Sequence, residues 1–254
     1  MLKLRLEGGL VAAWKPDTRR GPGRYRGEVA ARRLATALGL EANVPEVWLR
    51  GFTLDELRPG LAPEAARLLE AEALPARDGR VPGALIPWIA GLRFPPLDRE
   101  PGLGRWRRAL AGAPSARDHD EPPEDAARLG ELSALVVFDT LSGNWDRWSG
   151  GNLGEHPVTG HLLFIDNDGA FFASPPADAL ARQRKLLAGT RRFSASLVRA
   201  LAALDADRLD AVFGRDLAGG PLLGADALAG VRARLAEARR AVATQALDAG
   251  APLP

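Results

Sequence analysis

The chain contains no cysteine, which excludes disulfide bonds, cysteine-ligated zinc sites and thiol nucleophiles. It also has no apolar run of the roughly 20 residues that a membrane span requires. Residues 2–6 alternate apolar and basic side chains, which is typical of a strand and not of a signal peptide. We therefore expect a cytoplasmic protein with no membrane partner.

An excess of charge of one sign is also missing. The 34 basic and 32 acidic residues leave a formal net charge of only +2, so we expect no nucleic-acid partner. Hydrophobic residues make up 46% of the 254 residues and charged residues 26%, as in globular proteins. This length suffices for one large domain or for two lobes that share a cleft.

Lysine and asparagine are scarce. Only three of the 34 basic residues are lysine, and two of these, Lys3 and Lys15, lie near the N-terminus. Three of the four asparagines lie between residues 144 and 167. The abundance of Ala, Arg, Gly and Pro indicates a GC-rich coding background. Against this background, either chemistry that demands one particular side chain or chance with such small counts explains the clusters.

Periodicity divides the chain into a β-rich part, 1–90, and a helical part, 91–254. The first part is predicted to hold strands at 2–6, 10–15 and 44–50, an apolar stretch at 81–89, and helices at 27–38 and 62–73. The second is predicted to hold a short helix near Trp106, a strand at 161–165, and helices at 124–141, 178–188, 194–204, 205–213 and 225–247. The expected class is α+β, with a small β-rich lobe joined to a larger helical lobe.

Two acids and an asparagine flank the strand predicted at 161–165. Asp146 lies in a polar loop after a long apolar helix, Asn152 follows six residues later, and Asp166 ends the strand. Phosphoryl transfer needs this set, because the first acid can orient an attacking hydroxyl and accept its proton. Asn152 and Asp166 can hold a divalent metal through oxygen.

A lysine and a glutamate in the first 30 residues complete this set. Lys15 ends a predicted strand, and Glu28 lies at the start of the next predicted helix. Kinases pair a strand lysine with a helix glutamate to hold the α- and β-phosphates of the nucleotide. Each residue alone is a weak indication, but the ordered set is specific.

Simpler interpretations stay open for several of these residues. Lys15 can be an exposed strand lysine, Glu28 a helix N-terminal acid favoured by the helix dipole, and Asn152 an ordinary loop residue. Asp166 could instead open a calcium-binding loop, but the twelfth position, where an EF-hand needs an acid, is Ala177.

The chain resembles the secretory-pathway kinases grouped with the Golgi casein kinase, the xylosyl kinase of proteoglycan synthesis and the Four-jointed kinase. The similar segments run in that family's order over about residues 2–172: LKLRLEGGLVAAWKP, GEVAARRLATALGL, PGALIPWIAGL, VVFDTLSGNWDRW and LLFIDNDGAFF. The core Gly-Asn-x-Asp-Arg is the most specific piece. The lack of cysteine and of a signal peptide suggests a cytoplasmic member of bacterial type.

The resemblance implies a two-lobed protein-kinase-like fold with a shortened N-terminal lobe. It implies that Lys15 is the nucleotide lysine, Glu28 its partner, Asp146 the catalytic acid and Asp166 the metal-binding acid. It also implies a hinge around 83–88 and a second lysine near the phosphates, at Lys3.

Three functions are therefore weighed. The first is an active kinase that uses ATP and Mg²⁺ or Mn²⁺ on a hydroxyl of a protein, peptide or sugar. The second is a pseudokinase, a nucleotide-binding scaffold without turnover. The third is a small-molecule kinase of sugars or antibiotics on the same fold.

Overall fold

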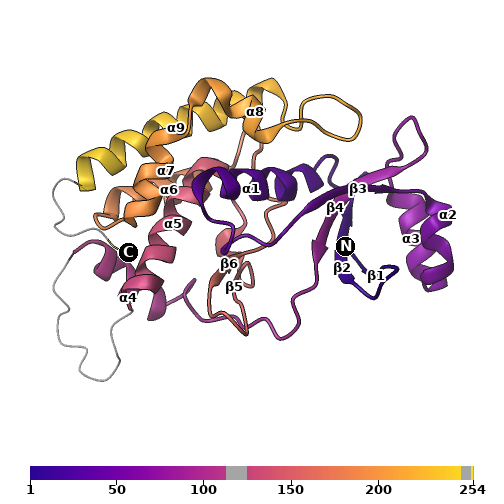
Figure 1. The fold of residues 1–254 in the computed structure, drawn as a ribbon, viewed down its shortest axis with the longest axis horizontal. Helices are drawn as coiled ribbons and strands as arrows, with labels where there is room; N and C mark the ends of the chain where they lie inside the picture. The colour runs from indigo at the N-terminus through magenta and orange to yellow at the C-terminus, as the bar shows by residue number, and fades with distance from the viewer. Residues whose placement is uncertain (113–124, 247–252, 254) are drawn as a thin grey trace.

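The computed structural model describes residues 1–112, 125–246 and 253. Its main sheet has four antiparallel strands in the order β1-β2-β4-β3 (Figure 1). The strands are β1 (Leu2–Arg5), β2 (Val11–Pro16), β3 (Trp48–Phe52) and β4 (Val81–Pro87). All four lie in the first 90 residues.

Alternating side chains give this sheet two different faces. Trp14 of β2 and Leu85 of β4 pack on one face, against a cluster that includes Leu57 and Leu69. These leucines belong to α2 (Leu54–Leu57) and α3 (Pro63–Glu72), the helices beside the sheet at one end of the molecule (Figure 1). Lys15 projects from the opposite face, because it is the next residue along β2.

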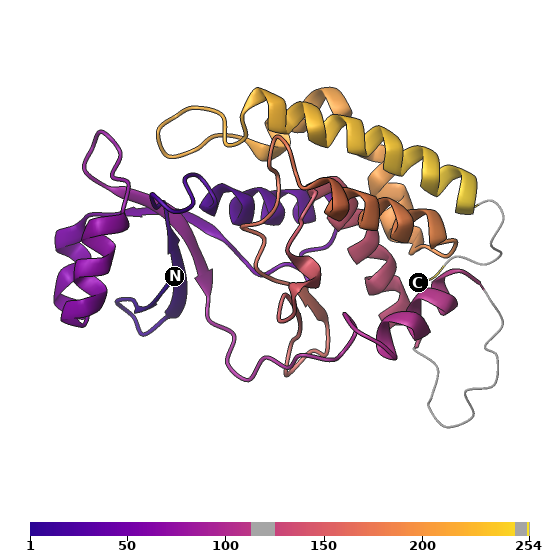
Figure 2. The same ribbon diagram turned by 180° about the vertical axis from the view of Figure 1, so that it is seen from behind.

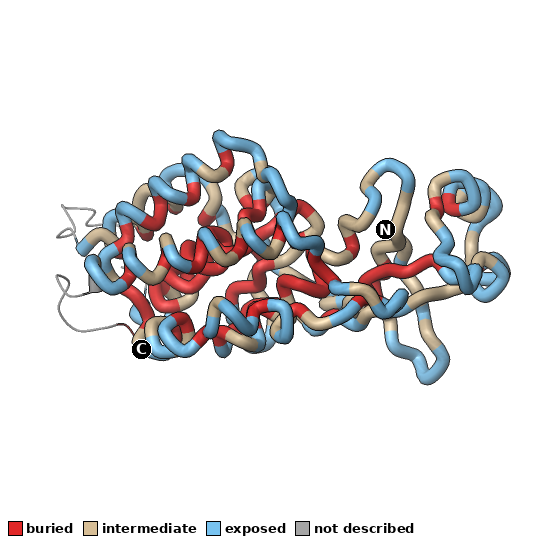
Figure 3. Tube along the Cα trace, turned by 90° about the horizontal axis from the view of Figure 1, so that it is seen from above, coloured by how far each residue is buried: buried red, intermediate tan, exposed pale blue. Residues whose placement is uncertain are grey.

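The other helices form the larger part of the molecule, and Figure 3 shows that most of the buried chain runs through them. α1 (Tyr25–Leu38) packs into the same apolar core, between the sheet and this helical part. The helices after the sheet are α4 (Gly102–Leu110), α5 (Ala126–Ser142), α6 (Ala177–Gly189), α7 (Ala195–Ala203), α8 (Leu209–Phe213) and α9 (Ala225–Ala246).

A second, two-stranded sheet lies between α5 and α6 in the chain. It pairs β5 (Leu153–Glu155) with β6 (Leu162–Phe164), with Leu153 opposite Phe164. Figure 2 shows this pair beside the segment that leads from β4 to α4. Within 1–112 and 125–246, no helix combines the length and hydrophobicity needed to cross a bilayer.

The predicted elements differ from the observed ones mainly at their ends. The strand expected at 44–50 begins only at Trp48, because Pro45 has no N–H for a ladder and Val44 is buried in the loop that follows α1. The short helix α2, with its Thr53–Glu56 capping box, was not predicted. Residues 124 and 247, the expected ends of two helices, lie outside the described residues.

Candidate active site

The ammonium of Lys15 meets three carboxylates. Its Nζ lies 2.5 Å from Oε1 of Glu28, 2.7 Å from Oδ1 of Asp166 and 3.7 Å from Oδ2 of Asp168. The Lys15 side chain is 14% exposed and that of Asp166 is 42% exposed, so this cluster opens to solvent on the Asp166 side. The structure therefore brings together three residues that the sequence analysis singled out.

Burial and charge act against each other in this cluster. Burial lowers the pKa of Lys15, but Glu28, Asp166 and Asp168 outweigh it, and the net pKa is raised. Burial raises the pKa of Glu28, while Lys15 lowers it, and burial is the stronger effect. A raised lysine pKa favours the ion pair and a raised glutamate pKa weakens it. The short contact and a backbone N–H bond both suit a carboxylate, so we assign Glu28 as ionised at neutral pH.

Glu28 is held by the start of α1, which rests on the turn after β6. Its Oε1 also accepts the backbone N–H of Asn167 at 2.9 Å. The preceding residue must be glycine for this approach, because a Cβ on Gly27 would lie 2.4 Å from the carbonyl oxygen of Asn167. The helix and the acidic turn are thus in direct backbone contact.

The turn after β6 carries two acids. Asp166 has a φ of 55°, in the left-handed region that costs a non-glycine residue on the order of 1 kcal/mol. Asp168 accepts Arg24 Nη2 at 2.5 Å through Oδ1. The cluster therefore holds three carboxylates and two cations, with Arg24 as the second cation.

Asp146 lies in the loop that follows α5. The helix ends at Gly143, whose φ is 65°, and Asn144 then turns its side chain into the protein. Asn144 Oδ1 accepts the N–H of Asp146 at 3.0 Å, and its Nδ2 donates to the carbonyl of Asp166 at 3.4 Å. One buried amide therefore links the two loops that carry the acids.

Asn152 is bound to Asp146. Its Nδ2 donates to the carbonyl oxygen of Asp146 at 2.9 Å and to the carboxylate Oδ2 at 3.2 Å. The Oδ1 atom of Asn152, the atom of this amide that can ligate a cation, takes no part in these bonds. The carbonyl of Asn152 accepts the N–H of Ile165, next to Asp166, at 3.2 Å.

Arg147 is the fully buried centre of this loop. Its Nε donates to both oxygens of Asp139 at 3.2 Å, and its Nη1 donates to the carbonyls of Asn152 and Ile165 at 2.6 and 2.5 Å. Its Nη2 reaches Oδ1 of Asn167 at 2.6 Å. One guanidinium therefore fixes the segments that carry Asp146 and Asp166.

The roles of Asn144, Arg147, Asn167 and Asp139 and the Arg24–Asp168 pair were not predicted from the sequence. One signal was present in the sequence, since Asp139 is the single charged residue in the apolar stretch between Glu131 and Asp146. A carboxylate there needs a buried cationic partner. Sequence alone does not say which arginine supplies it.

Lys3 is not part of the carboxylate cluster. It lies opposite Ala13 in the β1–β2 register, which places it on the Lys15 face of the sheet. Its ammonium sits 4.1 Å from the centroid of the Trp88 ring. Trp88 directly follows β4 and donates its N–H to the carbonyl of Val11, so this contact lies at the start of β2, whereas Lys15 lies near its end.

The acids and the amide of the two loops are suitable ligands for a divalent cation, but they are not arranged as a metal site in this structure. Asp146, Asn152, Asp166 and Asp168 offer only oxygen ligands, which Mg²⁺ and Mn²⁺ accept. Among the described residues, no three His, Asp or Glu side chains converge as a ready metal site. Asp166 and Asp168 are neutralised by Lys15 and Arg24, so a metal would have to replace these cations as their partner.

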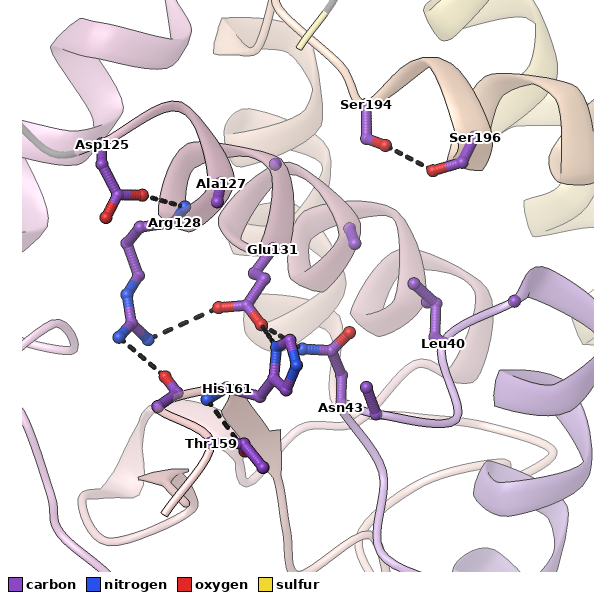
Figure 4. A pocket seen from close by; sticks show the side chains of 15 residues that line it. Leu40, Asn43, Asp125, Ala127, Arg128, Glu131, Thr159, His161, Ser194 and Ser196 are labelled. Atoms are coloured by element: carbon purple, nitrogen blue, oxygen red, sulfur yellow. Dashed lines mark hydrogen bonds and ion pairs between the residues drawn. The ribbon is translucent and has the colours of Figure 1, made fainter. Parts of the chain in front are cut away.

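A pocket of about 470 Å³ lies apart from this cluster, beside α5 and the start of α7 (Figure 4). Glu131 is its hub and accepts hydrogen bonds from Asn43, His161 and the N–H of Leu162. None of the residues that line it belongs to the carboxylate cluster. Its charged groups already bind one another, so it supports the base of β6 and we assign it no chemistry.

Solved kinase structures share this fold. The Golgi casein kinase, solved with Mn and ADP bound, matches with a TM-score of 0.68 at 13% identity, over 98% of this chain and 70% of that chain. The hydra Fam20 structure, solved with sugar, matches with a TM-score of 0.65 at 19% identity, over 98% of this chain and 82% of that chain. The fold is kinase-like. It has the predicted α+β class, with a small β-rich lobe and a larger helical one.

No protein-family model matches the sequence, and no curated protein does. The structural similarity therefore shows the fold alone, and any reaction must be inferred from the residues of the site.

Proposed function

We propose that the protein is an ATP-dependent phosphotransferase, a kinase that transfers the γ-phosphoryl group to a hydroxyl acceptor. One observation carries the proposal, the contact of the Lys15 ammonium with Glu28 and Asp166 at 2.5 and 2.7 Å. A strand lysine, a helix glutamate and a strand-end acid meet there from three distant segments. Kinases hold nucleotide phosphates and metal with this set.

Each residue then has a chemical role. Lys15, oriented by Glu28, binds the α- and β-phosphates of ATP. Asp166 and the Oδ1 atom of Asn152 hold Mg²⁺ or Mn²⁺ against the phosphates, with Asp168 beside them. Asp146 orients the acceptor hydroxyl and takes its proton. Most of the rate enhancement comes from positioning and charge neutralisation.

The β-rich and helical parts of the chain are proposed to be the two lobes of the kinase. We propose that residues 1–90 form the nucleotide-binding lobe and that 91–254 form the catalytic lobe. The hinge expected at 83–88 lies mostly within β4, which pairs with β2 and β3, so the hinge is proposed to follow Pro87. Lys3, which contacts Trp88 and has no ion pair with these carboxylates, is then a secondary nucleotide contact. The acceptor is a protein, a peptide or a sugar, the classes that fit a hydroxyl-directed kinase, and the protein works in the cytoplasm.

The family proposal rests on the structural neighbours and on the quoted segments. The Golgi casein kinase and the hydra Fam20 protein support membership of that kinase group, at identities of 13% and 19%. The absence of cysteine fits the proposed cytoplasmic, bacterial-type member, because disulfide bonds are rare in the reducing cytosol.

A pseudokinase is the second candidate, and one contact favours it. Asp166 is bound to Lys15 itself, so the proposed metal ligand is already neutralised. A scaffold that binds nucleotide weakly, without metal, would keep this pair closed.

Purified protein with radiolabelled ATP, Mg²⁺ or Mn²⁺ and a panel of peptides, glycans and small sugars tests the proposal. We expect label transfer that requires a metal and that Asp146→Asn abolishes. ATP binding that needs no metal, without transfer to any acceptor, supports the pseudokinase. No nucleotide binding under any condition overturns both.

A further inference from the structure

The loop 214–221, between α8 and α9, reaches back to α1 (Figure 1). It is closed by its own hydrogen bonds. The N–H of Asp216 donates to the carbonyl oxygen of Gly220 at 2.9 Å, and the N–H of Gly219 donates to the carbonyl oxygen of Asp216 at 2.9 Å. At the ends of the loop, the N–H of Leu222 donates to the carbonyl oxygen of Gly214 at 3.0 Å. Such a turn holds the Asp216 carboxylate in one place.

That carboxylate binds the first turn of α1. Tyr25 donates its hydroxyl to Oδ2 of Asp216 at 2.7 Å, and Arg26 donates Nε to the same oxygen at 2.8 Å. Asp216 is 8% exposed and Tyr25 2%, so the contact is buried. The other carboxylate oxygen accepts the N–H of Leu217 at 2.8 Å, which leaves no oxygen idle.

A second contact fixes α1 further along the helix. Arg33 donates to the carbonyl of Phe213, directly before the loop, and to that of Arg215 within it at 3.2 Å. The helix is therefore held at two points, about two turns apart, by one segment of the helical part.

Glu28 lies three residues after Tyr25, less than one turn away along the same helix. We infer that Asp216 is a positioning residue, which fixes α1 so that Glu28 stays in contact with Lys15 and with the turn at Asn167. The inference rests on the proposed function for its catalytic meaning. Because the Lys15–Glu28 and Asn167–Glu28 contacts measure 2.5 and 2.9 Å, a helix shift of about 1 Å would take the Asn167 hydrogen bond out of range and weaken the Lys15 ion pair.

Asp216→Asn tests this inference, because it keeps the shape but removes the charge and one acceptor. Asp210→Asn is the matched control, since Asp210 lies in α8, its side chain is 65% exposed and meets Arg232 at 3.8 Å, and its backbone bond to Gly214 is unaffected by the change. In Asp216→Asn we expect amide hydrogen exchange in 25–38 to rise about tenfold, with exchange in 225–246 unchanged. The KM for ATP should rise about five- to tenfold, with the KM for the acceptor unchanged.

Tyr25→Phe provides a second variant if Asp216→Asn does not fold, because it keeps the buried ring and removes one bond to Asp216. The double variant should be little worse than Asp216→Asn alone, as two partners of one contact are not additive. Exchange in 25–38 equal to that of the Asp210→Asn control would overturn the inference. So would an ATP KM equal to the control's in a protein that turns over.

The two proposals fail separately. If amide hydrogen exchange in 25–38 is faster in Asp216→Asn but the wild type binds no nucleotide, the kinase proposal is wrong and the contact of Asp216 with α1 is supported. Normal ATP-dependent turnover with unchanged exchange sinks the role of Asp216 and leaves the kinase proposal standing.

Discussion

The ammonium of Lys15 lies 2.7 Å from Oδ1 of Asp166, so the proposed phosphate-binding cation neutralises the proposed metal-binding acid. A metal and this ammonium compete for one carboxylate. Nucleotide phosphates give Lys15 another anionic partner and give the metal further oxygen ligands. Nucleotide and metal should therefore bind together, and each only weakly alone.

Thermal shifts measure this coupling. We expect ATP with Mn²⁺ to raise the melting temperature by more than the sum of the shifts from ATP and from Mn²⁺ alone. Lys15→Met should reverse the pattern, with tighter Mn²⁺ binding alone and weaker ATP binding. Lys185→Met, an exposed change in α6, is the control. Additive shifts in the wild type would contradict the competition.

The two proposed acids should separate binding from turnover. Asp146→Asn keeps the shape but removes the base that faces the acceptor, so turnover should fall about 10²–10⁴-fold with ATP·metal affinity within a few-fold. Asp166→Ala removes the metal ligand and should weaken ATP·metal binding itself. Calorimetric titration and initial rates measure the two effects.

The same pair of variants exposes a wrong assignment. If neither change alters nucleotide binding or activity, both acids only form loops. If Asp146→Asn weakens nucleotide binding as much as Asp166→Ala does, Asp146 contacts the nucleotide and not the acceptor.

Buried Asp139 predicts a pH dependence of stability. Burial raises the pKa of its carboxyl from 3.8 to about 6, although Arg147 lowers it. Between these pH values the folded protein holds a proton that the unfolded chain has released. The stability from this group is thus complete below pH 3.8 and lost as the pH rises through about 6, on the order of 1–3 kcal/mol.

Denaturant unfolding of wild type and Asp139→Asn at several pH values checks this sign. The free energy of unfolding of the wild type, relative to the variant, should fall between about pH 4 and 7. A relative stability that rises over this range would mean that the ion pair with Arg147 outweighs burial.

The sequence predicted most helices and strands to within a few residues of their observed ends. Strand alternation at Leu2–Arg5 and the apolar period of α5 depend on local patterning, which a single chain displays. Lys15, Glu28 and Asp166 could be expected to meet because a strand lysine, a helix glutamate and a strand-end acid follow one another in a fixed order, and the structure brings them into contact. The start of β3 was predicted four residues too early, because Pro45 cannot donate to a ladder and Val44 is buried in the loop before the strand.

The rest depends on contacts between distant segments. Asp216 binds Tyr25 across 191 positions, and Arg147 binds residues of three separate segments through its side chain. Neither pattern has a local period, and exposed arginines are common in this chain. Only the packed fold shows which arginine is buried and which loop reaches α1.

Gly27 gives the last prediction, because it lies between Glu28 and the acidic turn. In an exposed helix, Gly→Ala commonly stabilises by about 0.5–1 kcal/mol. Here the added Cβ would lie 2.4 Å from the Asn167 carbonyl oxygen, which belongs to the backbone and cannot rotate away. Gly27→Ala should therefore destabilise the protein by about 1–3 kcal/mol and weaken ATP·metal binding, because α1 must move off the turn that carries Asp166.

Gly189→Ala, at the end of α6 with no atom within 4 Å of its Cβ, should be neutral or slightly stabilising. Unfolding midpoints and ATP titrations of both variants decide the matter, and a Gly27→Ala protein as stable and as tightly binding as Gly189→Ala would show that α1 does not rest on the acidic turn in solution.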